Sequence, residues 1–352
     1  MRRVVVCGTK FGQVYLSALA EGPFELTGIL ARGSARSAAY AGEYGVPLLT
    51  DPDQVPDLAD LACVVVRSGV VGGEGSELAG ALLARGVHVL QEHPLHADEL
   101  ARCLRTARAA PAVHHVNTLY VHLDPVRRFV EAARRLCALQ KPLYVDAACS
   151  VHVAYALFDI LGRALGGLRP WTFGPAAQGT PFSCLTGTVG GVPLTLRVQN
   201  QIAPNDPDAH LHLLHRVTIG TEGGNLTLVN THGPIVWSPR MYVGRDADDR
   251  FALDDDHLRL PSATLLGPQE APTFREIVGT LWPSGIRRAL TGLRQAAEET
   301  AGKTAGEGAD PLRQGQYYLT LSRLWLDATA AIGRPELLVQ TAPLPLSAAE
   351  IS

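Results

Sequence analysis

Short apolar runs alternate with longer amphipathic segments over the first third of the chain. The first run, Arg3 to Cys7, is followed by a glycine-containing turn and an apolar-periodic stretch, which predicts a strand, a turn and a helix. The same succession recurs, with further strands predicted at 26–31, 61–66, 87–91 and 114–119 and helices at 13–20, 34–44, 76–85 and 97–109. Uninterrupted apolar strands that alternate with helices are typical of a parallel sheet covered on both faces. We therefore expect a doubly wound α/β Rossmann domain over residues 1–122.

The pattern changes after residue 122. A predicted helix at 125–138 precedes segments of alternating apolar and polar residues at 143–150, 193–201, 210–220 and 225–230. Such alternation predicts antiparallel strands with one covered face, and further helices are predicted at 158–165, 273–300 and 312–332. We expect residues 123–352 to form an α+β domain on an open, mainly antiparallel sheet that binds substrate and supports dimerisation. We also consider packing of the C-terminal helix against the first domain.

Composition narrows the classes of function. The chain has 352 residues, 46% hydrophobic and 18% charged, which is too apolar for a disordered protein. Its 31 basic and 34 acidic residues give a net charge of −3, so nucleic acid is not the expected ligand. No stretch reaches the ~20 apolar residues of a membrane helix, and the first apolar run ends at Lys10, too early for a signal peptide. We expect a cytoplasmic protein whose six cysteines are reduced thiols rather than disulfides or metal ligands.

The turn after the first predicted strand has the position of a dinucleotide site, because a pyrophosphate binds the amides at a helix N-terminus. Of the G-x-G-x-x-G pattern, only the first glycine is in place, so an ordinary strand-to-helix turn remains an alternative. The candidate cofactor residues of this turn are Gly8, Thr9, Lys10, Phe11 and Gly12.

The end of the second predicted strand indicates which cofactor binds. NAD-specific domains usually have an acidic residue there for the ribose 2′-hydroxyl, whereas this chain has Arg32, Gly33, Ser34 and Arg36. A guanidinium pairs with a phosphate through two hydrogen bonds, and Ser34 can cap the following helix. We therefore expect NADPH rather than NADH. The alternative is that both arginines are ordinary solvated surface charges.

Polar residues follow three further predicted strands, where ligands of open parallel sheets bind. Arg67 and Ser68 follow one strand and are expected to contact the nicotinamide ribose or carboxamide, or simply to end the strand. Glu92 and His93 follow the next strand and are candidate cofactor-binding residues, and Tyr120 follows the last strand. His93 and Tyr120 are the two candidate proton donors. The alternatives are that Tyr120 packs between domains and that His93 caps the helix that begins at Pro94.

The tripeptide Glu92-His93-Pro94 and the sheet-rich second half resemble the Gfo/Idh/MocA oxidoreductase family, which typically has Glu-Lys-Pro there. More specifically, the segments GTKFGQVYL, LARGSARS, CVVVRS, RGVHVLQEHPLH, VNTLY and HGPIVWS resemble thiazolinyl imine reductases of nonribosomal siderophore biosynthesis, of the yersiniabactin and pyochelin type. This resemblance implies NADPH-dependent reduction of a thiazoline C=N bond to a thiazolidine, on an intermediate tethered to a peptidyl carrier protein. It implies that His93 and Tyr120 are the proton donors.

Sugar-oxidising relatives usually carry an Asp-x-x-x-His pair on the first helix of the second domain. This chain has Asp159 followed by Arg163, so the usual base is missing and reduction is favoured over alcohol oxidation. Tyr155 and Asp159 are candidate substrate residues, although Asp159 can equally pair with Arg163 at spacing i, i+4. A sugar or inositol dehydrogenase and a non-catalytic NADPH-binding sensor or scaffold remain alternative functions.

Two further features concern metals and assembly. The histidines of HLHLLHR, at 210, 212 and 215, do not share one strand face and are not accompanied by a carboxylate cluster, so we interpret them as sheet surface rather than metal ligands. Relatives with an open sheet commonly pair through it, and a homodimer is expected by this analogy.

Overall fold

The computed structural model describes residues 2–66, 68, 73–203, 211–254, 256–302, 311–339 and 343–352. Contacts within the chain divide it into two compact units. The first contains Met1–Arg127 and Pro272–Leu326, and the second contains Arg128–Ala271 and Asp327–Ser352. The first unit therefore includes a segment from the last quarter of the sequence.

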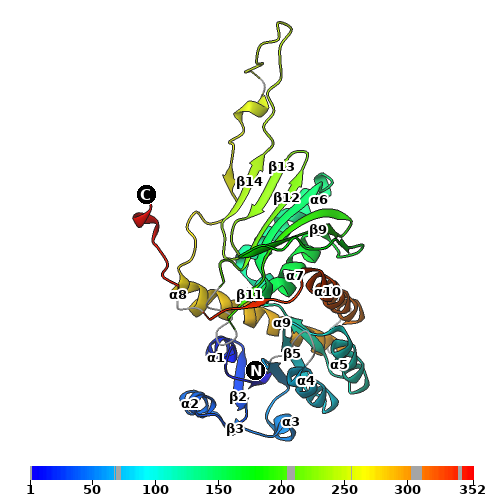
Figure 1. Cartoon of the computed structure of the whole chain (residues 1–352). Coiled ribbons are helices and arrows are strands. Elements are labelled where there is room, and N and C mark those ends of the chain that lie inside the picture. Colours follow the sequence, from blue (N-terminus) through cyan, green and yellow to red (C-terminus); the bar gives the residue numbers. More distant parts are fainter. Residues whose placement is uncertain are drawn as a thin grey trace. The chain divides into compact units, whose positions relative to one another are not determined.

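The first unit is built on a six-stranded sheet in the order β3-β2-β1-β4-β5-β6 (Figure 1). All neighbouring strands in it are parallel. This is the strand order of a doubly wound Rossmann fold, as the sequence predicted. Its strands are β1 (Arg2–Cys7), β2 (Phe24–Leu30), β3 (Leu48–Leu49), β4 (Leu61–Val64), β5 (His88–Glu92) and β6 (His114–Asn117).

Helices pack on both faces of this sheet. Val5 and Val89 lie in one apolar cluster with Leu82 and Cys103, which come from two neighbouring helices on the same face. Gly12 at the start of another helix approaches Val6 Cγ1, which belongs to the opposite face of β1. The helices of this unit's N-terminal part are α1 (Gly12–Leu19), α2 (Ala35–Tyr44), α3 (Val55–Leu58), α4 (Glu74–Ala84) and α5 (Ala97–Ala109).

A late segment of the chain adds helices to the first unit. Helix α8 (Phe274–Glu276) leads through a π-helical turn into α9 (Trp282–Thr300), which packs against α1. The rings of Phe11 and Trp282 lie 6.1 Å apart at this contact. Two long helices, α6 (Asp124–Leu139) and α10 (Pro311–Ile332), each run from one unit into the other.

The second unit contains an eight-stranded sheet in the order β15-β14-β13-β12-β7-β10-β9-β8. Only β7 and β10 pair in parallel among these described strands, and the remaining neighbours are antiparallel. The expected combination of a parallel Rossmann sheet with a mainly antiparallel second sheet is therefore confirmed. The strands are β7 (Tyr144–Ser150), β8 (Thr172–Phe173), β9 (Phe182–Val189), β10 (Val192–Gln199), β12 (His215–Thr221), β13 (Gly224–Leu228), β14 (Ile235–Pro239) and β15 (Thr264–Leu265).

Helix α7 (Ala154–Leu165) supplies apolar core to the second unit, and ten of its twelve residues are buried. It begins four residues earlier than the predicted helix, because its first turn is as buried as its centre and carries no amphipathic signal. Two short strands, β11 (Gln201–Ile202) and β16 (Glu336–Leu337), pair in parallel. Between β14 and β15 the chain extends away from the sheet in Figure 1.

The interpretation of the HLHLLHR histidines as sheet surface is wrong for His215. This residue is 1% exposed in β12, and its ring lies 3.0 Å from Thr231 Oγ1 and 3.0 Å from the carbonyl oxygen of Val153. The alternation placed His215 on the opposite face from its neighbours, and that face is the covered one. His212 is exposed, and His210 lies outside the described residues.

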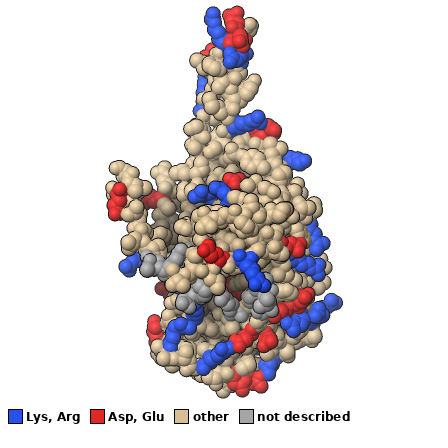
Figure 2. Space-filling model, viewed as in Figure 1, with Lys and Arg blue, Asp and Glu red and all other residues tan. Residues whose placement is uncertain are grey.

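Charged residues of both signs are spread over the visible face of the molecule in Figure 2. This distribution agrees with a net charge of −3. Among the described helices, none is long and apolar enough to cross a membrane.

Candidate active site at the strand ends

The candidate residues of the first unit follow the carboxyl ends of parallel strands. Because β1, β2, β4, β5 and β6 run in the same direction, these ends share one edge of the sheet. Residues that are far apart in sequence are therefore brought together there. The structure describes all of the predicted cofactor and proton-donor residues except Arg67, which lies outside the described residues.

The turn between β1 and α1 has the backbone form of a dinucleotide site. Gly8 has φ of +90°, and an added Cβ would lie 2.8 Å from the carbonyl oxygen of Val65. A side chain is excluded there by both conformation and space. Helix α1 begins at Gly12 with no acidic residue in its first turn and no side-chain cap at Phe11, so its first amides face no competing anion within the helix. Thr9 is buried and Lys10 is exposed. These features fit a pyrophosphate.

The loop after β2 carries the residues predicted to contact a 2′-phosphate. Ser34 caps α2, since its Oγ accepts a hydrogen bond from the amide of Ser37, and Gly33 has φ of +80°. Arg36 Nε donates to Thr9 Oγ1 over 3.4 Å, which joins this loop to the glycine turn. Arg32 pairs with Glu74, and the two side chains are 80% and 66% exposed. The Arg32 guanidinium is therefore exposed at the surface, paired with Glu74 of α4.

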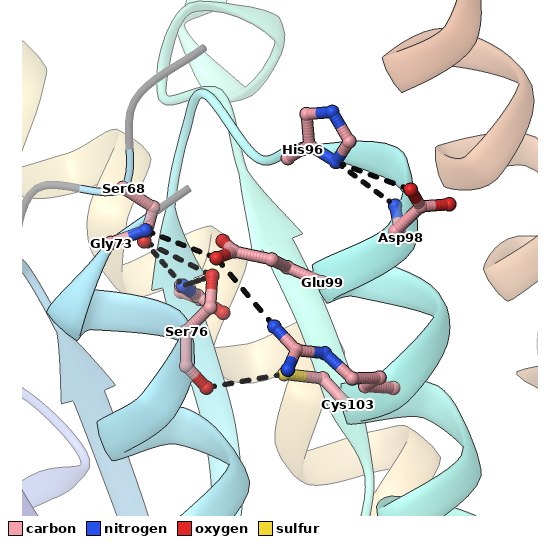
Figure 3. Close-up of polar contacts among 9 residues, drawn as sticks. Ser68, Gly73, Ser76, His96, Asp98, Glu99 and Cys103 are labelled. Atoms are coloured by element: carbon pink, nitrogen blue, oxygen red, sulfur yellow. Dashed lines mark hydrogen bonds and ion pairs between the residues drawn. The ribbon is translucent and has the colours of Figure 1, made fainter. Parts of the chain in front are cut away.

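Ser68 follows β4 and belongs to a buried hydrogen-bond cluster (Figure 3). Its Oγ receives hydrogen bonds from Ser76 Oγ at 3.1 Å and from Gln91 Nε2 at 3.3 Å. The amide of Gly73 donates to Glu99 Oε1 at 3.1 Å, which ties the start of α4 to α5. The hydroxyl of Ser68 is thus engaged within the protein. Its contact with a cofactor stays a prediction.

The ends of β5 and β6 form a second buried polar group around Glu92. Glu92 Oε1 lies 3.0 Å from His93 Nδ1, and the two side chains are 13% and 8% exposed. The hydroxyl of Tyr15, on α1, donates to Glu92 Oε2. Asn117 Nδ2 donates to the Tyr15 hydroxyl at 2.6 Å and lies 3.4 Å from Glu92 Oε2. The structure therefore joins α1, β5 and β6 through hydrogen bonds around Glu92, and Glu92 lies within ion-pair distance of the His93 ring.

His93 is also fixed by the backbone of the neighbouring strand end. Its amide nitrogen and its ring Nδ1 each lie 3.1 Å from the carbonyl oxygen of Asn117. The His93–Pro94 peptide bond is cis. Nδ1 thus faces the protein on two sides, toward Glu92 and toward Asn117.

Tyr120 lies beside His93, as the sequence predicted. The two rings are 6.3 Å apart at an interplanar angle of 73°, and Tyr120 is 6% exposed. Leu119 precedes it with φ of 55° and ψ of −59°, a backbone conformation that a leucine rarely adopts. The Leu119 amide donates to Asn117 Oδ1 at 2.9 Å, and an added Cβ on Gly285 of α9 would lie 3.2 Å from Leu119 Cδ1. Asn117 and α9 therefore fix the turn that presents Tyr120.

Burial affects the ionisation of Tyr15. It raises the pKa of the Tyr15 hydroxyl well above its usual value, and the Glu92 charge adds to this effect. Tyr15 is fully buried and keeps its proton, so it acts as a hydrogen-bond donor toward Glu92.

The two candidate substrate residues lie in the second unit, on α7. Tyr155 and Asp159 are each 1% exposed. Asp159 Oδ1 accepts a hydrogen bond from Arg163 Nε at 2.7 Å, so the structure adopts the i, i+4 pair that the sequence allowed. A role of either residue toward substrate stays a prediction.

Two residues of the Glu92 group were not predicted from sequence as functional. Tyr15 belongs to a helix whose apolar period places it inward, but no motif links it to Glu92, which follows 77 residues later. Asn117 lies near the end of the predicted strand 114–119, three residues before Tyr120, and this position was the available signal.

Two family models match the chain. Residues 2–118 match the oxidoreductase family with an NAD-binding Rossmann fold, GFO_IDH_MocA, and residues 140–238 match the C-terminal domain of thiazolinyl imine reductase Irp3-like proteins. Among curated proteins, a sequence search finds no match.

Solved structures share the fold at low sequence identity. A 3-ketoreductase from Actinomadura kijaniata, KijD10, solved with TDP-benzene and NADP, has a TM-score of 0.66 at 17% identity, covering 96% of this chain and 99% of that chain. UDP-N-acetylglucosamine 3-dehydrogenase GnnA from Acidithiobacillus ferrooxidans has a TM-score of 0.62 at 13% identity, covering 94% and 98%. Biliverdin reductase from Synechocystis, solved with biliverdin and NADP+, has a TM-score of 0.62 at 12% identity, covering 93% and 99%.

The strand order, the glycine turn and the matched family models agree with one another. The expected resemblance is confirmed over residues 2–118 and 140–238, since each of these segments matches a family model. Residues 2–118 therefore form an NAD(P)-binding Rossmann domain of the Gfo/Idh/MocA oxidoreductase family, and residues 140–238 match the C-terminal domain of the Irp3-like thiazolinyl imine reductases.

Proposed function

We propose that this oxidoreductase reduces the C=N bond of a thiazoline to a thiazolidine, with NADPH as the cofactor. The substrate in this proposal is a nonribosomal peptide intermediate tethered to a peptidyl carrier protein, in the biosynthesis of a siderophore or a related natural product. Docking of the carrier protein and pairing of two copies of this chain belong to the same proposal.

The match of residues 140–238 to the Irp3-like C-terminal domain is the observation that carries the proposal. The residue types at the strand ends support it. Position 93 holds a histidine, joined to Glu92, where family members typically have a lysine. Asp159 is engaged with Arg163, where sugar-oxidising relatives have a histidine four residues after the aspartate.

Reduction of a C=N bond needs a hydride at carbon and a proton at nitrogen. The cofactor, when bound, supplies the hydride. The chain must supply the proton, and His93 and Tyr120 are the adjacent side chains at the strand ends that can donate one. After transfer, the ring nitrogen of the substrate carries an N–H bond and the donor is reprotonated from solvent.

The choice of NADPH rests on the loop after β2. Arg32 provides an exposed guanidinium, and Arg36 lies against Thr9 of the glycine turn. A planar guanidinium can hold a phosphate through two hydrogen bonds, whereas a ribose hydroxyl offers no charge to pair with.

The test is cofactor oxidation by the purified chain with a small-molecule thiazoline ester or thioester, followed at the nicotinamide absorbance band. NADPH and NADH are compared, and NADP+ and NAD+ are run with a panel of sugars and polyols. We expect thiazoline-dependent turnover that favours NADPH, with a thiazolidine product identified by mass spectrometry.

Two outcomes would contradict the proposal. Turnover of a sugar or polyol without turnover of the thiazoline would establish a dehydrogenase of the same family. Tight NADPH binding without turnover of either substrate class would indicate a sensor or scaffold.

A further inference from the structure

The hydrogen bonds around His93 determine which of its nitrogens carries a proton. Nδ1 lies 3.0 Å from Glu92 Oε1 and 3.1 Å from the carbonyl oxygen of Asn117. A backbone carbonyl only accepts hydrogen bonds, and so does an ionised carboxylate. A bare Nδ1 would place a lone pair against both acceptors, so Nδ1 carries the hydrogen. Nε2 is then the nitrogen that gains and loses a proton.

The far side of Glu92 is held by donors. Asn117 Nδ2 donates to the Tyr15 oxygen at 2.6 Å, so the Tyr15 hydroxyl hydrogen is free to point at Glu92 Oε2. Asn117 Nδ2 also lies 3.4 Å from the same carboxylate oxygen. Hydrogen bonds from two neutral donors stabilise a carboxylate without neutralising it. Both oxygens of the Glu92 carboxyl, 13% exposed, are therefore engaged within the protein.

A carboxylate 3.0 Å from Nδ1, together with the Asn117 carbonyl oxygen that accepts from Nδ1–H, does two things for a histidine. It fixes the ring orientation and tautomer, and it stabilises the positive charge of the imidazolium. Tyr120 has a different setting, at the end of a turn fixed by Asn117 Oδ1 and packed near α9. The hydrogen bonds from Tyr15 and Asn117 to Glu92 therefore act on His93 through the Glu92 carboxyl group.

We propose that Glu92, Tyr15 and Asn117 hold His93 with Nδ1 protonated, so that His93 Nε2 is the proton donor of the reaction and Tyr15 is a positioning residue. This inference rests on the proposed function for its substrate, but the tautomer is a property of the chain alone. In the reaction, the Nε2–H bond breaks as the substrate N–H bond forms, and the cofactor hydride becomes the new C–H bond. Neutral His93 keeps its Nδ1–H between Glu92 and the Asn117 carbonyl oxygen, and a solvent proton restores Nε2–H.

The first measurement is nitrogen-15 NMR of the histidine rings in the full chain without substrate, with the His93 signals assigned by comparison with His93→Gln. We expect neutral His93 to have its hydrogen on Nδ1. We expect Glu92→Gln to weaken this preference, since a neutral amide is a poorer acceptor. A ring that carries its hydrogen on Nε2 in the wild-type chain would overturn the proposal, whatever the substrate proves to be.

The second measurement is a double-mutant cycle on kcat with the thiazoline substrate. We expect Tyr15→Phe to lower kcat about tenfold in the wild-type chain and less than about twofold in His93→Gln, because its effect passes through His93. Equal losses in both backgrounds would show a general structural role and contradict the proposal. Tyr40→Phe is the matched control, since the Tyr40 hydroxyl contacts Gln13 at the surface, and it should leave kcat unchanged.

Glu92→Gln provides a variant that keeps the shape of the side chain. We expect Glu92→Gln to lower kcat with the thiazoline substrate more in the wild-type chain than in His93→Gln, because its effect passes through the His93 ring 3.0 Å away. Equal losses in both backgrounds would contradict the role of Glu92. If the wild-type chain does not reduce the thiazoline but the NMR result is as expected, the proposed substrate fails and the assignment of His93 Nε2 as the proton-exchanging atom stands.

Discussion

The ends of β2 and β5 are both candidate parts of the same site, but the protein treats them differently. At the end of β5, Glu92 and His93 are 13% and 8% exposed and linked to α1 and β6 by hydrogen bonds. At the end of β2, the Arg32 side chain is 80% exposed and meets the exposed Glu74. The buried end is organised by the fold itself. At the exposed end, the charged side chains are present, and we expect a bound ligand to fix their geometry.

This difference predicts how much free energy each strand end loses when a charged partner is removed. An exposed ion pair contributes about 0–1 kcal/mol, so Arg32 can exchange Glu74 for a phosphate with little loss. A buried carboxylate that loses a partner leaves a charge unsatisfied, which costs several kcal/mol. Substitutions at the buried end should therefore change the rate of chemistry or the stability, and substitutions at the exposed end should change cofactor affinity.

The largest expected effect is that of His93→Gln. Loss of the proton donor should lower kcat with the thiazoline substrate by about 10²–10⁴-fold while leaving NADPH affinity within a few fold. Tyr120→Phe is the comparison, and we expect it to lose less than about tenfold. Steady-state kinetics of both variants measure these losses. An equal loss of activity in Tyr120→Phe and His93→Gln would contradict the assignment of His93 as the proton donor.

A second prediction concerns His114, which is 4% exposed on β6 and bonded through Nε2 to Gln91 Oε1 at 2.9 Å. Burial, with a smaller effect of His115, lowers the pKa of His114 to about 3. The unfolded chain takes up this proton near pH 6.5, so between these values the unfolded state binds more protons and stability falls as pH falls. Urea unfolding of wild type at pH 7.5 and pH 5 should show a loss that His114→Gln reduces by about 2 kcal/mol.

Identical losses in wild type and His114→Gln would show that other groups dominate the acid response. His232 is one such group, since burial lowers its pKa to about 4. A His232→Gln variant therefore belongs in the same series of urea titrations.

Arg32→Ala tests whether the exposed end of β2 contacts the 2′-phosphate of NADPH. Removal of a charge-assisted hydrogen bond worth about 1.5–3 kcal/mol should weaken NADPH binding tenfold or more and leave NADH binding nearly unchanged. Titration by nicotinamide fluorescence measures both. Arg85→Ala removes another partly exposed arginine, paired with Asp53, and serves as the control. Equal weakening for NADPH and NADH would refute contact with the 2′-phosphate.

The smallest expected effect is that of Glu74→Gln. Loss of a competing carboxylate beside Arg32 should strengthen NADPH binding by less than about threefold, because the pair is exposed. The same fluorescence titration detects this change at low salt, and added salt should reduce it. Weaker NADPH binding in this variant would instead mean that Glu74 orients Arg32 for the phosphate.

The sequence predicted the parts of this comparison that depend on strand order. Because the strands of a Rossmann sheet end at one edge, Glu92, His93 and Tyr120 were placed together by position alone. Arg32 and Arg36 were identified because they replace an expected acidic residue. The bounds of most strands in the first unit agree with the apolar runs within a few residues.

The remaining parts depend on packing that the sequence does not encode locally. The helical period places Tyr15 inward, but which strand end its hydroxyl reaches depends on how α1 packs on the sheet. His215 was misjudged because the alternation gives its face and not what covers that face, here the backbone before α7. Tertiary packing decides both cases.

The strained backbone at Leu119 lowers the stability of the folded chain and fixes the turn that presents Tyr120. A leucine held at φ of 55° raises the energy of the folded state by about 1–3 kcal/mol, which the contacts of Asn117 and α9 must offset. Leu119→Gly would remove that strain, although it would also free the turn that aims Tyr120. Because the Leu119 side chain is 1% exposed, its loss would also leave a cavity that costs about 2–5 kcal/mol, so substitutions at this position should lower both the melting temperature and the rate of reaction.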